Sequence, residues 1–150
     1  MRESEERYGP DHIETAVTRT ALALALADDG QYAAAAREAA EGARVRTAVL
    51  GPTDPATIQA QRVLVGVLVR DEEWDRVAAL YPGLIAAELA LSGPRADRTL
   101  GARVNHAISL RRSGRAGEAQ AELRDVLPVC VENLGDGHVV TEACRAALAR

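Results

Sequence analysis

Three histidines are the side chains of this sequence best suited to metal binding or acid–base chemistry. A neutral imidazole can bind a metal ion, and its charge changes close to neutral pH. His12 and His138 each follow a glycine by three residues, in two similar short segments near opposite ends of the chain. We therefore interpret both as turn residues that lie far apart. His106 stands alone among apolar residues, which is typical of a core histidine with a hydrogen-bond partner. The histidines predict no metal site.

Two acidic pairs could serve general acid–base catalysis if they shared a cleft. Asp28 and Asp29 form the first pair, and Glu72 and Glu73 form the second. Both pairs occur in short polar breaks between apolar segments, where solvated turns are expected. We interpret them as turn residues.

The known short motifs of catalysis and metal binding are also missing from the sequence. It contains no H-E-x-x-H, no C-x-x-C and no glycine-rich phosphate loop between a strand and a helix. Pro10 follows Gly9 and removes a backbone amide that a phosphate loop would need. Cys130 and Cys144 lack the spacing of a metal site or a disulfide scaffold, so we expect free, partly buried thiols. The sequence predicts a protein that is not an enzyme and has no cofactor.

A regular interval of 42 residues organises the chain. At each step, a glycine in a turn is followed six residues later by a threonine. A period between about 20 and 50 residues is the signature of stacked repeats. We predict one domain over residues 1–150, with repeats at 9–50, 51–92 and 93–134 and a single cap helix over 135–150. The glycine and threonine pairs are Gly9 and Thr15, Gly51 and Thr57, Gly93 and Thr99, and Gly135 and Thr141.

Each full repeat carries two helical patterns separated by a polar break. In the first repeat, apolar periodicity predicts helices over about 12–27 and 32–49. Asp54 is placed to cap the next helix, with Pro55 at its first position. The repeating threonines lie in the first turn of these helices, so we assign them a structural role. Pro82 and Pro128 fall inside second helices, where we expect a kink or a local break.

The composition of the chain limits the classes of partner that it can bind. The net charge of -4 and a pI near 5.4 argue against nucleic-acid binding, which needs a concentrated basic surface. No apolar run approaches the roughly 20 residues needed to cross a bilayer. The charged start of the chain lacks the apolar core of a signal peptide, so we expect a cytoplasmic protein.

The repeats resemble tetratricopeptide repeats, in the 42-residue variety found in kinesin light chains and in many actinobacterial proteins. The resemblance rests on the turn over 50–57, the similar turn over 9–15 and the central segment over 30–35. It implies an all-α fold: a right-handed superhelical solenoid of antiparallel helix pairs, with three full repeats and a C-terminal capping helix. The sequence departs from the family pattern at Glu72, where a central glycine is usual, and at Ala116, where an aromatic residue is usual.

The resemblance also implies a function. In this family, the first helices of the repeats line a concave groove, which suggests a non-catalytic module that binds a protein, as a peptide or helical segment. Arginines among the inward positions favour an acidic partner with apolar anchors. The inward positions carried over to this sequence are Val17, Thr20, Leu24, Gln59, Arg62, Val69, Arg70, Val104, Ile108, Arg111 and Arg112.

Two alternatives remain open. A homodimer or scaffold could form through apolar residues at the solenoid ends, because the fourth repeat lacks its second helix and residues 2–7 look too short to cover the first helix. An accessory small-molecule site could instead form near Trp74 and Tyr81, although these positions match packing slots. The apolar residues at the C-terminal end are Val139, Val140, Ala146, Ala147 and Leu148.

Overall fold

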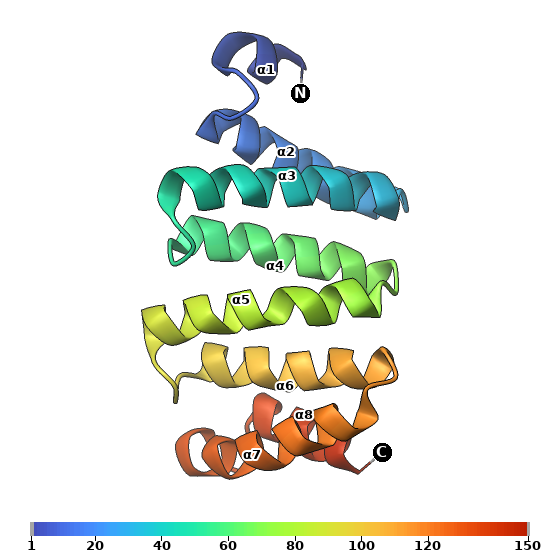
Figure 1. Cartoon of the computed structure of the whole chain (residues 1–150), viewed down its shortest axis with the longest axis vertical. Helices are drawn as coiled ribbons and strands as arrows, with labels where there is room; N and C mark the ends of the chain where they lie inside the picture. The colour runs from blue at the N-terminus through green and yellow to red at the C-terminus, as the bar shows by residue number, and fades with distance from the viewer. Residues whose placement is uncertain (1, 150) are drawn as a thin grey trace. The chain divides into compact units, whose positions relative to one another are not determined.

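The computed structural model describes residues 2–149, and within them the chain forms α-helices and no strands. The helices pack as consecutive antiparallel pairs, which confirms the predicted all-α class (Figure 1). The first and second helices of the three full pairs have constant lengths of 16 and 19 residues. The eight helices are α1 (Arg2–Tyr8), α2 (Ile13–Asp28), α3 (Tyr32–Leu50), α4 (Pro55–Arg70), α5 (Trp74–Ser92), α6 (Asp97–Arg112), α7 (Ala116–Leu134) and α8 (Val139–Leu148).

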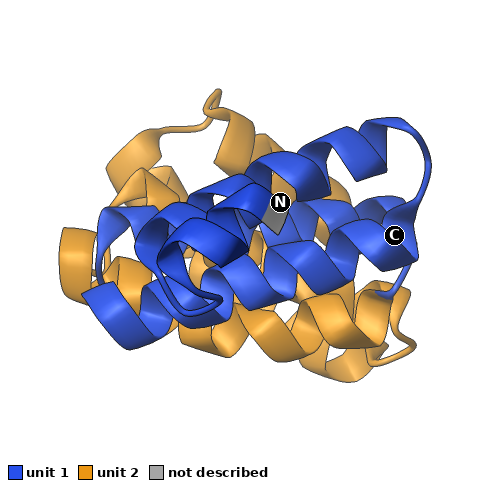
Figure 2. Cartoon of the chain, turned by 90° about the horizontal axis from the view of Figure 1, so that it is seen from above, with its two compact units in different colours: residues 1–73 blue, residues 74–150 orange. Residues whose placement is uncertain are grey.

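The chain divides into two compact units, residues 1–73 and residues 74–150 (Figure 2). In the first unit, α2 packs against α1, α3 and α4, and α3 also packs against α4. In the second unit, α6 packs against α5, α7 and α8, and α7 also packs against α8. Each unit therefore places two first helices side by side, α2 with α4 and α6 with α8.

The glycine at the head of each repeat turn has a positive φ of 85° to 89°, a conformation that costs glycine little. The threonine six residues later closes the turn in two of the four copies. Thr15 donates its hydroxyl to the carbonyl of Gly9 at 2.7 Å, and Thr99 donates to the carbonyl of Gly93 at 2.8 Å. These buried threonines thus satisfy a turn carbonyl and fix the entry into the helix.

One prediction follows from this difference between the copies. Replacing Thr99 by valine keeps the shape of the side chain but leaves the half-buried carbonyl of Gly93 without its donor. We expect the free energy of unfolding to fall by about 1–2 kcal/mol in a urea titration. Thr141 is the matched control, because it is equally buried and its hydroxyl has no hydrogen-bond partner among residues 2–149. Its valine variant should change stability by less than about 0.5 kcal/mol. Equal losses in both variants would contradict this assignment.

The helix starts also use capping side chains. Asp54 accepts a hydrogen bond at 2.8 Å from the backbone N–H two residues later, and Pro55 takes the first helical position as predicted. His12 and His138 cap α2 and α8 in the same way through Nδ1, at 3.2 and 3.3 Å. The prediction that these two histidines are turn residues is therefore confirmed.

Close approach of α2 and α3 depends on Gly42. A Cβ atom added there would lie 2.9 Å from Thr20 Oγ1 and 3.1 Å from the backbone carbonyl oxygen of Ala16. The residues that fill this interface are mostly alanines, such as Ala23 and Ala39, which are at most 1 % exposed. Small side chains allow the two helix axes to come close together, and the chain thereby builds a core without phenylalanine.

Gly42→Ala should separate these helices and lower the free energy of unfolding by about 1–2 kcal/mol, because overpacking outweighs the gain in helix propensity. Gly66 in the same unit is the matched control, since nothing lies within 4 Å of its added Cβ. Gly66→Ala should raise stability by about 0.5–1 kcal/mol, through helix propensity alone. The check is thermal and urea unfolding of both variants. A stabilising Gly42→Ala would contradict the close approach.

Of the kink or local break expected at Pro82 and Pro128, the break does not occur, since α5 and α7 run through these residues. Both prolines lie on the exposed side of their helices, where water can reach the carbonyl left without a donor, and buried neighbours hold each helix in place. Residues 2–7, expected to be too short to cover the first helix, lie in a helix that packs against α2. In this helix, α1, Ser4 hydrogen-bonds Thr18 of α2 at 3.1 Å and Glu5 pairs with Arg19.

Candidate functional site

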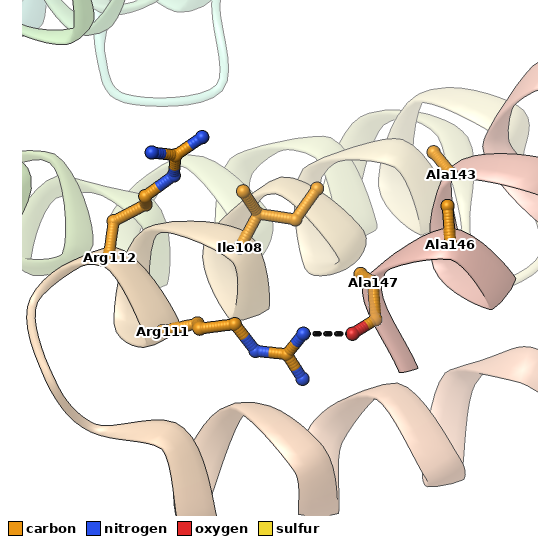
Figure 3. A pocket seen from close by; sticks show the side chains of 6 residues that line it. All are labelled: Ile108, Arg111, Arg112, Ala143, Ala146 and Ala147. Carbon is orange, nitrogen blue, oxygen red and sulfur yellow. Dashed lines mark hydrogen bonds between the residues drawn. The ribbon is translucent and has the colours of Figure 1, made fainter. Parts of the chain in front are cut away.

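The seam between α6 and α8 in the second unit carries two hollows of about 240 Å³ each. Both are lined by first-helix residues, and they share Ala143. We refer to the two hollows together as the α6–α8 trough. The first hollow is lined by Ile108, Arg111, Arg112, Ala143, Ala146 and Ala147 (Figure 3). The second hollow is lined by Gly101, Val104, Asn105, Val139, Val140 and Ala143.

Small residues create the hollows, and the core of the unit holds their walls. Gly101 on α6 and the alanines of α8 leave space where larger side chains would fill the seam. On the opposite face of α8, Thr141 and Cys144 are both fully buried and hold the helix against the rest of the unit. Ala143 also packs against the buried core of the unit. The trough is therefore a surface feature with a rigid base.

Two arginines stand at one end of the trough. Arg111 donates a hydrogen bond to the backbone carbonyl of Ala147 (Figure 3). The guanidinium of Arg112 lies 5.4 Å from the centre of the Trp74 ring. Within residues 2–149, neither guanidinium has a carboxylate within ion-pair distance, although Arg103 and Arg115 of the same unit do. Two adjacent positive charges without a counter-charge thus border an apolar hollow.

The structure brings together four of the predicted groove residues in this trough. Ile108, Arg111 and Arg112 line the first hollow, and Val104 lines the second. The side chain of Val104 is 1 % exposed, so it forms the floor of the hollow and offers little surface of its own.

Most of the predicted groove residues of the first unit are exposed, whereas Thr20 is hydrogen-bonded within the unit. Val17, Leu24 and Val69 are 48 %, 49 % and 38 % exposed, and Gln59 is also exposed. Thr20 is engaged, because it donates to the carbonyl of its own helix four residues earlier and accepts from Arg46 at 2.5 Å. Its hydroxyl serves the α2–α3 interface.

Arg70 and Arg62 of α4 complete the predicted set. The guanidinium of Arg70 lies 5.3 Å from the centre of the Tyr32 ring and donates to Asp28 at 3.1 Å. Arg62 is half-buried. The pairing of Arg70 with Tyr32 recurs one repeat later as Arg112 with Trp74, which the sequence analysis missed although both pairs are 42 residues apart.

The histidine and cysteine side chains considered for chemistry in the second unit are hydrogen-bonded or buried. His106 Nδ1 lies 2.8 Å from a carboxylate oxygen of Glu122, as expected for a satisfied core histidine. Cys130 and Cys144 are free and fully buried, which goes beyond the predicted partial burial. Burial raises the pKa of both thiols, that of Cys144 to about 11. Among residues 2–149 there is no cluster of three side chains that could hold a metal ion, nor a helix with the length and apolar character needed to cross a bilayer.

The residues named for the two alternative sites lie partly in the core and partly at the surface. Val140, Ala147 and Leu148 pack against the core of the second unit, whereas Val139 is 72 % exposed. Tyr81 is 7 % exposed and its ring lies 6.0 Å from the ring of His106.

Antiparallel helix pairs of constant length and a surface trough define an all-α repeat protein. The sequence model of the tetratricopeptide repeat family matches residues 15–56. No curated protein sequence matches the chain. Residues 15–56 thus match a tetratricopeptide repeat, and the helix pairs have the fold of solved kinesin-light-chain-like repeat structures, as the sequence predicted. Repeats of this family are generally protein-interaction modules and typically non-catalytic.

Solved structures support the same fold. Two crystal structures of nearly identical TPR-like repeats, from a sequence assigned as a kinesin light chain in Podosopora anserina, resemble this chain. One has a TM-score of 0.84 at 17 % identity and covers 99 % of this chain and 70 % of its own. The other has a TM-score of 0.79 at 18 % identity and covers 93 % of this chain and 66 % of its own.

Proposed function

We propose that the chain is a non-catalytic module that binds a peptide or helical segment of a partner protein, one that combines carboxylates with apolar side chains. The observation that carries this proposal is the pair Arg111 and Arg112, which border an apolar hollow without a carboxylate partner in residues 2–149. Charge-assisted hydrogen bonds to a carboxylate are among the stronger polar contacts in proteins. The partner would thus supply the missing counter-charge.

In this proposal, each unit offers contact residues of its own. In the second unit the trough receives apolar side chains, and Arg111 and Arg112 receive carboxylates. In the first unit, exposed apolar side chains on α2 and α4 offer further contact area. The proposed contact residues there are Val17, Leu24, Gln59, Arg62, Val69 and Arg70, with Val104 and Ile108 completing the second unit.

Selection from a random peptide library displayed on phage tests this function. The immobilised chain should enrich sequences that combine acidic and apolar residues, and the enriched peptides, made synthetically, should bind with micromolar affinity. A library selected against the heat-unfolded chain controls for non-specific apolar binding. If no peptide is enriched on the folded chain, or if the enriched peptides lack acidic residues, the proposal is wrong.

A further inference from the structure

Taking the proposed function as its basis, we infer that the α6–α8 trough selects an extended segment with two apolar side chains three residues apart and a carboxylate beside one of them. The segment would place one apolar side chain in each hollow and a carboxylate at Arg111 and Arg112. Three features of the trough carry this inference: the distance between the hollows, the amide of Asn105 and the position of the two arginines.

The two hollows repeat each other along α6. Gly101, Val104 and Asn105 line the second hollow, and the residues seven positions later line the first. Seven residues of α-helix rise about 10 Å. An extended polyproline-type segment rises about 3.1 Å per residue and has three residues per turn. Its side chains at positions i and i+3 therefore point to the same side about 9 Å apart, which matches the hollows.

Asn105 favours an extended occupant over a helical one. Its side chain is exposed at the second hollow, and it makes no hydrogen bond to any other residue in 2–149. A carboxamide can donate and accept at the same time. An extended segment has free backbone N–H and C=O groups for such an amide, whereas a helix uses its own internally. A helix with apolar residues at i and i+7 would match the distance between the hollows but would leave Asn105 without a partner.

The two arginines determine where a carboxylate of the bound segment would lie. Arg111 and Arg112 lie at the C-terminal end of α6, and both line the first hollow. A carboxylate next to the apolar residue in that hollow would lie within their reach. Carboxylates at the middle of the segment would instead face Val104 and Ile108, so an acidic residue is expected at the end of the apolar pair that occupies the first hollow.

Two isomeric peptides test the spacing. The first is acetyl-Asp-Asp-Leu-Pro-Ser-Leu-Asp-Asp-amide, and the second has the same composition with its leucines adjacent, acetyl-Asp-Asp-Leu-Leu-Pro-Ser-Asp-Asp-amide. The spaced peptide should bind at least tenfold more tightly, because only it fills both hollows. Binding is measured by calorimetry and by the fluorescence of Trp74, the single tryptophan, which lies against Arg112. A third peptide, helical and with leucines at i and i+7, tests the other occupant.

A substitution in the chain then ties the preference to the trough. Ala146 is exposed and lines the first hollow, so Ala146→Leu should fill it and reduce the affinity for the spaced peptide to that for its isomer. Ala149→Leu is the matched control, since Ala149 is exposed and lines neither hollow. Equal affinities for the two isomers, tighter binding of the helical peptide, or no effect of Ala146→Leu would overturn the inference. Each of these results would leave the proposed function intact. The proposed function fails only if the library yields no peptide that combines acidic and apolar residues.

Discussion

Replacing Arg111 and Arg112 together by glutamate is expected to weaken the binding of acidic, apolar peptides at least 100-fold. The substitution removes up to two charge-assisted hydrogen bonds between the guanidiniums and the carboxylates of the peptide, each worth about 1.5–3 kcal/mol. Two new negative charges then face the carboxylates of the peptide. The measurement is fluorescence anisotropy of a labelled library peptide at 0.15 M salt, with circular dichroism to check that the variant stays helical.

Arg95 and Arg98 provide a matched control for net charge. They lie in the same unit near the start of α6, are exposed, and have no carboxylate within ion-pair distance in residues 2–149. Replacing both by glutamate changes the net charge by the same amount at the opposite end of the helix. Charges separated by more than about 8 Å are largely screened at this salt concentration, so we expect less than a threefold loss. If both double variants lose affinity equally, the effect is one of overall charge and the arginine pair is not the site.

The sequence was most informative where local chemistry decides the structure. Asp54 and Pro55 start a helix because a carboxylate cap and a fixed φ act over only a few residues. Gly30 takes a positive φ of 77° and ends the first helix pattern, as its type predicts. Glu72 stands where the family pattern has a glycine, yet its backbone takes the same left-handed conformation, with φ of 56°. The backbone hydrogen bonds from Glu72 and Glu73 to the last turn of α4 require this conformation.

Tertiary contacts decided the features that the sequence analysis missed. The residues of α1 have no apolar periodicity, and this helix depends on Ser4 and Glu5 contacting α2. Thr20 appeared to face a partner, yet the close approach at Gly42 turns its hydroxyl towards Arg46. Local propensity contains neither interaction, because each joins residues on different helices.

The candidate site was predicted on one wall only. The repeat register correctly placed Ile108, Arg111 and Arg112 on a shared surface of α6. The opposite wall comes from α8, whose Ala146 and Ala147 were considered as an exposed end and not as the side of a trough. A comparison of α8 with α6 in the repeat register would have shown these alanines at the positions of the larger Val104 and Asn105. Packing of α8 on α6 is what turns these small residues into hollows.

Leu123→Ala should produce a large loss of stability in the second unit, about 2–5 kcal/mol in the free energy of unfolding. Leu123 is 0 % exposed and lies in the core cluster that joins α6, α7 and α8. Its backbone carbonyl also accepts a weak hydrogen bond at 3.5 Å from Sγ of Cys144 on α8. Removing the side chain leaves a cavity beneath the helix that forms one wall of the trough.

Leu89 gives the comparison that separates this cavity from the loss of any leucine. It lies on α5 in the same unit and is 45 % exposed, so Leu89→Ala should cost less than about 1 kcal/mol. Urea unfolding followed by circular dichroism and by Trp74 fluorescence measures both variants, and amide hydrogen exchange locates the change. Because Leu123 supports α8, exchange in residues 139–148 should accelerate more than exchange in α5. A loss below about 1 kcal/mol for Leu123→Ala, or faster exchange confined to α5, would mean that α8 is held by contacts other than this core, and that the trough does not depend on it.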